Sequence, residues 1–509
     1  MQLEFYGAAS CVTGSCHILR IQNKTVLLDC GLFQGKDEKE RGNNYFIFNP
    51  EDIDYIILSH AHIDHSGRIP LMYKMGFRGD VICTEGTMDL CDVMLKDSGY
   101  IQQMEVEWRN RKRVRQGLEP IEPLYTTQDA EASMNLFRGY SYDKFIELFE
   151  GLKIRFKDAG HLLGSSIIEI FIKDKDDDEE TKLVYTGDLG NINVPLLKDP
   201  TYIEYADYII METTYGNRYH GNITNQLNEL IKIIEETTKR GGNVIIPSFA
   251  VGRTQEVLYI LNEYAENNIL KDITVYVDSP LATEATKIFE KYKNYYDDDA
   301  KKLLQKGDNP LNFKGLVFTK SVQDSMMVNK IQSGAVIISS SGMCEAGRIR
   351  HHLKHNLWRK ECSIVFVGYQ AEGTLGYSIL NGKKKVKLFG EEVTVNAKIY
   401  NLEGLSGHAD RAGLLNWIKK LKKKPREILL VHGNEDSEEG FKKLLNAKDY
   451  KARIMELGQI YKINQMESIN KLSMKERLIK LIDYYDNIEN IDKNMLLTKI
   501  DNILNSTEE

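Results

Sequence analysis

Three histidines and an aspartate stand within six positions of this chain, directly after a short apolar run at residues 54–58. The run is typical of a buried strand, and the polar string after it contains His60, His62, Asp64 and His65. A single histidine is usually explained by packing, but this grouping is not. Imidazole and carboxylate groups are suited to zinc. The string therefore predicts a metal centre beside a β-strand.

The spacing of the string favours two metal ions. Residues two apart in an extended chain point the same way, so His60 and His62 are placed to hold one metal. Asp64 and His65 lie on the following turn and are placed to hold a second metal about 3.5–4 Å away, the usual separation in two-metal hydrolases.

Two metals need more ligands than this string supplies, and three other positions are candidates. His161 stands among small residues, and Asp188 directly follows a predicted strand, where a carboxylate can bridge two cations. Asp29 ends another predicted strand and is placed to accept a hydrogen bond from a ligand histidine.

The chain has 509 residues, which is too long for one ordinary domain. Residues 16–21 and 25–28 predict a β-hairpin. Residues 88–150 predict mostly helix with an arginine-rich cluster, which is interpreted as a solvated face, with phosphate steering as the alternative. Strands alternate with helices over 216–380, which favours a parallel sheet. Residues 466–509 predict a helical tail.

Composition and charge limit the classes of protein. There are 67 Lys and Arg against 74 Asp and Glu, for a net charge of −7, which argues against a basic nucleic-acid binder but not against a local basic patch. The seven cysteines are irregularly spaced, which predicts no disulfide framework and a reducing compartment. No leader and no long apolar run is present in the sequence, so we expect a cytoplasmic protein without a membrane partner.

The order of Asp29, the histidine string, His161 and Asp188 resembles the motifs of the metallo-β-lactamase fold, and residues 5–9 and 12–15 are similar to its RNA-processing branch. Further motifs resemble the β-CASP nucleases: Glu212 is similar to motif A, His408 to motif B and His432 to motif C. The pattern is most similar to the bacterial and archaeal relatives of the endonuclease subunit of the cleavage and polyadenylation factor. Asn434 stands where many relatives carry Glu.

The resemblance implies an α/β architecture, in which a metallo-β-lactamase αββα sandwich carries an inserted α/β β-CASP domain. It implies a first part of the sandwich at 1–211, the insertion at 212–385, a second part of the sandwich at 386–462 and a helical extension at 463–509. Substrate is expected to pass between the two domains. The tail is expected to pack against the body or against another subunit, which leaves a homodimer open.

The resemblance also implies a zinc-dependent ribonuclease with two zinc ions per chain and RNA as the substrate. It assigns His60, His62, His161 and Asp188 to the first zinc, and Asp64, His65, His432 and the shared Asp188 to the second. Asp64 is also a candidate proton acceptor, and His408 held by Glu212 is the candidate general acid. The candidate RNA-binding residues are Ser248, Arg253, Ser340, Ser341 and Arg348, with arginine suited to bidentate phosphate contacts.

Three alternatives remain at this point. A small-molecule hydrolase of the same fold is disfavoured because such enzymes lack the long insertion with motifs A and B. A DNA nuclease is disfavoured because histidine at motif C accompanies RNA substrates in the family. A non-catalytic RNA-binding scaffold is disfavoured because such members lose metal ligands. The choice between internal and 5′-end cleavage, and the natural RNA target, are left open.

Overall fold

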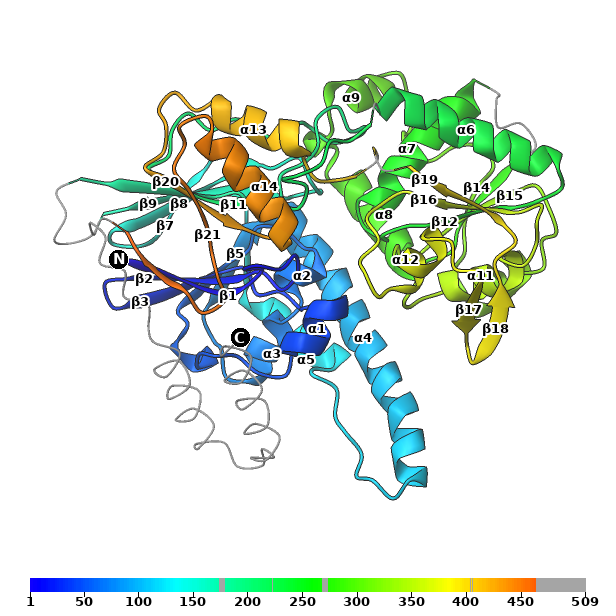
Figure 1. The fold of residues 1–509 in the computed structure, drawn as a ribbon, viewed down its shortest axis with the longest axis horizontal. Coiled ribbons are helices and arrows are strands. Elements are labelled where there is room, and N and C mark those ends of the chain that lie inside the picture. Colours follow the sequence, from blue (N-terminus) through cyan, green and yellow to red (C-terminus); the bar gives the residue numbers. More distant parts are fainter. Residues whose placement is uncertain (174–178, 222, 268–272, 403, 405, 464–509) are drawn as a thin grey trace.

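The computed structural model describes residues 1–463 apart from 174–178, 222, 268–272, 403 and 405. Figure 1 shows two parts side by side. One part contains two sheets, and we call it the sandwich lobe; the other is built on a third sheet, and we call it the insert lobe. The predicted tail at 466–509 lies outside the described residues.

The first sheet of the sandwich lobe is antiparallel at one side and parallel at the other. Its strand order is β22 (Ile460–Lys462), β1 (Gln2–Gly7), β2 (Cys16–Ile21), β3 (Lys24–Leu28), β4 (Tyr55–Ile57), β5 (Asp80–Thr84) and β6 (Phe137–Tyr140). The β2–β3 pair is antiparallel, which confirms the predicted hairpin. Strands β3 to β6 are parallel to one another, so their carboxyl ends share one edge.

The second sheet combines strands from both ends of the chain. Its order is β21 (Ala452–Ile454), β20 (Glu427–Val431), β11 (Tyr208–Glu212), β10 (Thr181–Tyr185), β9 (Ser166–Ile172), β8 (Leu152–Asp158) and β7 (Phe145–Phe149). Strands β11 and β20 are parallel, with Glu212 opposite Val431. This pairing brings the segment after β20 beside the segment after β11, although the whole insertion separates them in sequence.

The two sheets enclose a fully apolar core that includes Phe5, Ile168 and Leu429. Helices cover the outer faces, so the layers run helix, sheet, sheet, helix (Figure 1). The helices and short 3₁₀ turns near the first sheet are α1 (Gly35–Arg41), η1 (Pro50–Asp52), α2 (Ile63–Ser66), α3 (Ile69–Lys74), α4 (Glu85–Arg115), α5 (Thr127–Ser133) and η2 (Met134–Leu136). Those near the second sheet are α13 (Arg411–Lys419) and α14 (Glu435–Asn446).

The insert lobe has a parallel sheet, as the βα alternation predicts. Its order is β14 (Leu316–Phe318), β13 (Thr274–Val277), β15 (Ala335–Ser339), β12 (Val244–Pro247), β16 (Ser363–Phe366) and β19 (Lys398–Asn401). A hairpin of β17 (Lys385–Leu388) and β18 (Glu391–Thr394) lies beside it. The helical elements are α6 (Ile223–Lys239), α7 (Arg253–Glu266), α8 (Pro280–Lys291), η3 (Lys293–Tyr295), α9 (Asp298–Gln305), α10 (Val322–Val328), α11 (Ile349–Asn356) and α12 (Leu375–Leu380).

Two sequence expectations differ from the structure. The mostly helical prediction for 88–150 is wrong over 137–149, where β6 and β7 form, because β-branched and aromatic residues there pair with buried neighbours. The insertion was expected to end at 385, but β19 pairs in parallel with β16 of the insert sheet. We therefore propose a boundary after Asn401, since a strand belongs to the sheet that satisfies its backbone hydrogen bonds.

All seven cysteines are buried and none forms a disulfide, which agrees with the absence of a disulfide framework in the sequence. Among the described residues, no helix is both long and apolar enough to cross a membrane.

Candidate metal centre

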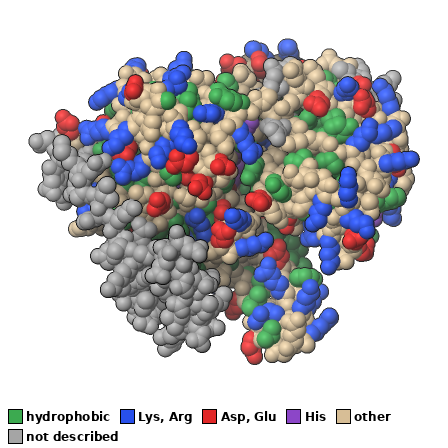
Figure 2. Space-filling view, viewed as in Figure 1, with side chains coloured by type: hydrophobic (Ala, Val, Ile, Leu, Met, Phe, Trp, Pro, Cys, Tyr) green, Lys and Arg blue, Asp and Glu red, His purple; other side chains and the backbone are tan. Residues whose placement is uncertain are grey.

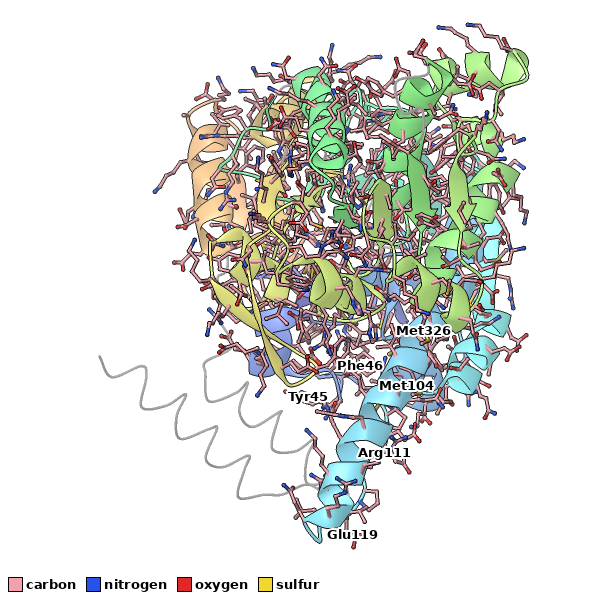
Figure 3. All side chains as sticks on the ribbon, turned by 90° about the vertical axis from the view of Figure 1, so that its right-hand side faces the viewer. Tyr45, Phe46, Met104, Arg111, Glu119 and Met326 are labelled. Atoms are coloured by element: carbon pink, nitrogen blue, oxygen red, sulfur yellow. The ribbon has the colours of Figure 1, made fainter. Side chains whose placement is uncertain are left out.

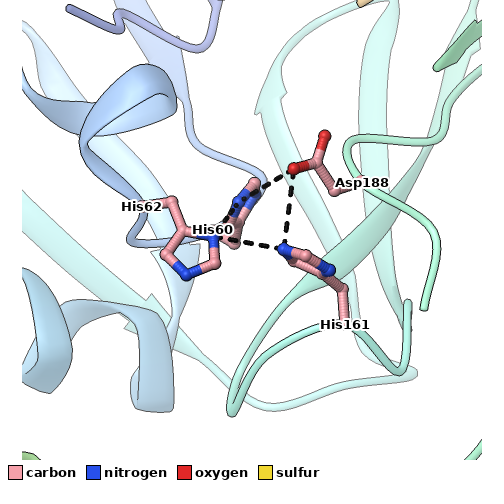
Figure 4. Close-up of side chains that lie close together, drawn as sticks. All are labelled: His60, His62, His161 and Asp188. Atoms are coloured by element: carbon pink, nitrogen blue, oxygen red, sulfur yellow. Dashed lines mark hydrogen bonds and ion pairs between the residues drawn. The ribbon is translucent and has the colours of Figure 1, made fainter. Parts of the chain in front are cut away.

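Four side chains from three segments converge at one edge of the sandwich lobe (Figure 4). His60 and His62 follow β4, His161 follows β8 and Asp188 follows β10. One ligand atom of each lies within 4.8 Å of the others. The His62 Nδ1 atom is 3.2 Å from His60 Nε2 and 3.1 Å from His161 Nε2. The Asp188 Oδ2 atom is 3.4 Å from His60 Nε2. We call these four residues the first group.

A second group, formed by Asp64, His65 and His432, lies beside the first. The Nε2 atoms of His65 and His432 are 3.1 Å apart, and His432 Nε2 is 3.7 Å from Asp64 Oδ2. Asp188 connects the two groups, because its Oδ1 atom is 3.3 Å from His65 Nε2 while Oδ2 faces His60. One carboxylate therefore presents an oxygen to each group.

The two groups fit divalent cations. Ligands at the usual zinc distance of about 2.0–2.1 Å in a tetrahedron are about 3.3–3.4 Å from one another, and the separations above are close to that value. The Asp188 Oδ1 atom is buried and has no hydrogen-bond partner, although buried polar atoms are nearly always satisfied. A cation between the groups would satisfy it, and the donor set of imidazoles and carboxylates is the one zinc prefers.

Hydrogen bonds hold four of the histidine rings from behind, so that their Nε2 atoms face the centre. The bonded Nδ1 atoms and their partners are His60 with Ser59 Oγ (3.0 Å), His65 with Asp29 Oδ2 (2.7 Å), His161 with the Gly407 carbonyl (3.1 Å) and His432 with Thr214 Oγ1 (3.0 Å). Such outer partners orient metal-binding histidines and select their tautomer.

Asp29 is the most heavily bonded of these outer partners. It accepts hydrogen bonds from the Ser59 amide, the Ser59 hydroxyl, the Tyr185 hydroxyl and His65 Nδ1, each at 2.7 Å. The hydrogen bond from a histidine that the sequence predicts for Asp29 is therefore present. Because Asp29 is fully buried and saturated with donors, it orients the His65 ring firmly.

Two glycines allow the backbone segments of the site to approach one another. A Cβ atom on Gly31 would lie 1.6 Å from the Asp64 carbonyl oxygen, and one on Gly190 would lie 2.0 Å from the Gly160 carbonyl oxygen. Any larger residue would displace the turn that carries Asp64 or the turn that carries His161. These glycines allow the close approach of backbones that the centre requires.

Glu212 and His408 lie next to the two groups. Glu212 is buried at the end of β11 and accepts hydrogen bonds from the amides of Leu189 (2.7 Å) and Thr214 (3.2 Å). The His408 Nδ1 atom is 3.2 Å from Glu212 Oε1 and 3.9 Å from Asp188 Oδ2. The His408 side chain is 20% exposed, so part of it is accessible from solvent.

The charges of the site support these arrangements. Burial alone would raise the pKa of Asp188, but the surrounding histidines, led by His432 and His65, hold this pKa well below its usual range. Burial alone would lower the pKa of His408, but the carboxylates of Glu212 and Asp188 outweigh it and raise the pKa to about 9. Asp188 is thus an anion that suits a cation, and His408 carries a proton at neutral pH.

Of the candidate RNA-binding residues, Arg253 lies near the His161 ring, and its guanidinium also pairs with the buried Glu256 carboxylate. Its Nη2 atom is 3.3 Å from the position that a Cβ atom on Gly407 would take, beside the His161 ring. Ser340 and Arg348 lie together at the carboxyl end of β15, around Asp278. The Ser340 hydroxyl is 2.9 Å from that of Ser279, and Arg348 Nη1 donates to Asp278 Oδ1 at 2.6 Å.

The other two candidates are bonded within their own loops. The Ser341 hydroxyl accepts a hydrogen bond from the Ala346 amide, and Ser248 is buried and bonded to Phe249 and Thr254. The neighbouring His352 is buried, and its Nε2 atom lies 2.6 Å from Asp278 Oδ2.

Sequence reasoning did not single out Ser59, Thr214 or Tyr185, which hold the rings and Asp29. The available signal was position, because each stands within three residues of a candidate that was identified. A hydroxyl side chain close in sequence to a candidate metal ligand is a candidate hydrogen-bond partner, since buried imidazole and carboxylate atoms need such partners. Asn434, which differs from many relatives, caps α14 by accepting a hydrogen bond from the Ser437 amide, so its role here is structural.

Three family descriptions match separate parts of the chain. Residues 9–74 match the "Metallo-beta-lactamase superfamily", residues 254–379 match the "Beta-Casp domain", and residues 392–455 match the "Zn-dependent metallo-hydrolase RNA specificity domain". The first match contains His60, His62, Asp64 and His65, the third contains His432, and the second covers most of the insert sheet.

Several characterised proteins are similar over most of the chain. A protein named ribonuclease TTHA0252 from Thermus thermophilus is 36% identical over 459 residues, which cover 90% of this chain and 99% of that protein. An RNase J-like protein from Methanocaldococcus jannaschii is 31% identical, over 85% of this chain and 92% of that protein. The transcription termination factor FttA of the same organism is 32% identical, over 86% of this chain and 67% of that protein.

Proposed function

Since this chain belongs to the β-CASP family of metallo-β-lactamase-fold nucleases and is a metal-dependent RNA hydrolase, we propose that its centre holds two zinc ions and cleaves RNA phosphodiester bonds. The single observation that carries this proposal is the pair of groups joined by Asp188, whose buried Oδ1 atom has no hydrogen-bond partner. The first zinc is held by His60, His62, His161 and Asp188. The second is held by Asp64, His65, His432 and Asp188.

When bound, two metal ions offset the charge of the phosphate and lower the pKa of a bound water to about 7. The chain's own residues supply the proton transfers. Asp64 accepts the proton of the attacking water, and its side chain is 20% exposed, so water can reach it. His408 gives a proton from Nε2 to the leaving oxygen, because Glu212 engages Nδ1 and leaves Nε2 directed away from that carboxylate.

The substrate is held by groups of the insert lobe. Arg253 lies beside the centre and offers a guanidinium to the scissile phosphate or its neighbour. Ser340, Ser341 and Arg348 bind a phosphate further along the RNA. The contacts of Ser340 with Ser279 and of Arg348 with Asp278, at the carboxyl end of β15, support this placement. Ser248 supports the loop before α7, because its hydroxyl is buried and bonded within that loop.

The metal stoichiometry tests this proposal. Purified protein, stripped with a chelator and titrated with zinc, is expected to bind close to two equivalents per chain and to recover RNA cleavage as the second equivalent binds. Elemental analysis and cleavage of an RNA labelled separately at its two ends, in 5′-phosphate and 5′-triphosphate forms, are the measurements. Cleavage by fully stripped protein would contradict the proposal, as would faster turnover of a single-stranded DNA or a reporter thioester.

The pH dependence of cleavage tests the role of Glu212. The protonated form of His408 is the active one, so cleavage is expected to decline as pH rises through its pKa. Glu212→Gln removes the negative charge that raises this pKa. The alkaline decline of log kcat/KM is therefore expected to begin about 1–3 pH units lower in the variant. An unchanged alkaline limb in the variant would show that another group controls it.

A further inference from the structure

Helix α4 continues far beyond the body of the sandwich lobe. Its buried residues end at Gly99, and every residue from Tyr100 to Arg115 is exposed or half-buried. At about 1.5 Å per residue these 16 positions extend about 24 Å. Figures 1 and 3 show this part of α4 as an arm that leaves the body, with Met104 and Arg111 along it.

One face of the arm is covered by the returning chain. Gln103 Oε1 accepts hydrogen bonds from Thr127, Asn110 exchanges two with Ile121, and Arg113 donates to the Glu119 carbonyl. At 100° per residue the opposite side of the helix presents a different set, which we call the arm face. It consists of Tyr100, Met104, Trp108, Arg111, Lys112 and Arg115.

The arm face combines exposed aromatic rings with positive charge. Tyr100 is 58% exposed and Trp108 is 57% exposed, and Lys112 Nζ lies 3.5 Å from the centroid of the Trp108 ring. Glu105 and Glu107 lie at the margins of the face, where Glu105 pairs with Arg109 and Glu107 pairs with Arg111 of the face. The face therefore offers rings and three cations, one of which, Arg111, is in an exposed ion pair.

The arm begins at the junction of the two lobes. The buried half of α4 contacts α2, which carries Asp64 and His65. It also contacts α8 of the insert lobe, where Asp89 pairs with Lys291 and accepts a hydrogen bond from Tyr292. One continuous helix thus connects the surroundings of the metal centre to the arm face.

Further positive charge lies on the insert lobe near the same end of the junction. The exposed lysines here are Lys383 and Lys384, before β17, and Lys385 and Lys387, within it; Lys385 pairs with Glu392 of β18. Figure 2 shows Lys and Arg gathered along the lower part of the insert lobe and on the arm.

We propose that the arm face binds the single-stranded part of an RNA substrate that extends beyond the metal centre. Aromatic rings stack on bases of any sequence, and interspersed cations contact phosphates, which is how single strands are bound without base-specific contacts. Tyr, Trp, Met and Arg are also enriched at protein interfaces. RNA is favoured here because the face adds three cations to its rings and because the same helix contacts α2, which carries Asp64 and His65. The inference rests on the proposed RNA cleavage at the metal centre. Its test therefore measures RNA binding by the arm face separately from cleavage at the centre.

The test compares a long RNA of about 40 nucleotides with a short one of about 8 nucleotides. Trp108→Ala is expected to raise KM for the long RNA about tenfold, as loss of one stacked base implies, and to leave kcat unchanged. The triple variant Arg111→Gln, Lys112→Gln, Arg115→Gln is expected to reduce the salt dependence of long-RNA binding. The slope of log K against the logarithm of the salt concentration is expected to become shallower by about 2. Neither variant is expected to change turnover of the short RNA.

The control variant carries the same change of charge on helices at the opposite end of the insert lobe in Figure 1. Lys232→Gln, Lys239→Gln, Lys302→Gln alters side chains that are 74%, 76% and 66% exposed, and it is expected to behave as the unaltered protein. Equal KM values for long RNA in the arm variants and the control would overturn the proposal. So would arm variants that only convert an oligomer into monomers in solution, which would make the face a contact between copies. Failure of the unaltered protein to cleave the short RNA would instead refute the function proposed for the centre.

Discussion

Asp188→Asn is expected to lower the rate of RNA cleavage by at least about 10⁴-fold and to reduce the metal bound per chain. Asp188 directs one oxygen to His60 and the other to His65, each at less than 3.5 Å, so the amide removes the anion that both groups share. Two-metal sites lower the pKa of water from about 15.7 to about 7. If Asp188→Asn lost half of this pKa shift, the fraction of water present as hydroxide, and with it the cleavage rate, would fall by about 10⁴-fold.

Metal content and turnover must be measured on the same preparation of Asp188→Asn. Glu204→Gln is the matched control, because it also replaces a carboxylate by an amide, but in an exposed ion pair with Lys422. The control is expected to keep both metal and activity. An Asp188→Asn protein with two bound metals and near-normal cleavage would show that Asp188 does not connect the two groups.

His408→Ala is expected to slow cleavage by about 10²–10⁴-fold, the usual worth of a general acid, while the metal content stays unchanged. The reason is that His408 belongs to neither the first nor the second group of candidate metal ligands. Its Nδ1 atom is instead closest to Glu212, at 3.2 Å. The measurement is again zinc content together with the cleavage rate, now on a substrate with a natural leaving group.

This experiment distinguishes a general acid from a metal ligand. The distinction is needed because Asp188, Glu212 and His408 also lie close enough together to hold a metal ion. If His408→Ala lost zinc in proportion to activity, His408 would be a ligand and the general acid would have to be another residue. An RNA analogue with a leaving group that needs no proton should be cleaved by His408→Ala at nearly the normal rate. His355→Ala, which removes an exposed histidine on α11, is the control for a general effect of losing an imidazole.

Much of the centre was predictable because its parts are local in sequence. The string from His60 to His65 follows a three-residue buried strand, and the short helix α2 places His65 and Asp64 on the next turn. The hydrogen bond to Asp29 was also predictable, because Asp29 ends β3 and the string follows β4, its parallel neighbour. The architecture came from resemblance of motifs rather than from composition or periodicity.

Other features were decided by contacts between distant segments. The pairing of β19 with β16, from which we propose a boundary after Asn401 rather than at 385, depends on β16 offering a free edge, which no local pattern reveals. The arginine-rich part of α4 was interpreted from sequence as a solvated face. Only the structure shows that it leaves the body with its aromatic residues exposed, because the pattern of a helix does not tell which neighbours will cover it.

The sequence by itself determined the chemistry available to this protein, since the number and spacing of histidines and carboxylates admit few interpretations other than a metal centre. The tertiary structure decided how these groups meet. Strands β11 and β20 pair in parallel across an insertion of about two hundred residues. This pairing, together with the packing of the two sheets, brings His432 to within 3.1 Å of His65. The physical reason is that local patterns depend on neighbours along the chain, whereas the meeting of strand ends depends on burial of both sheets in one apolar core.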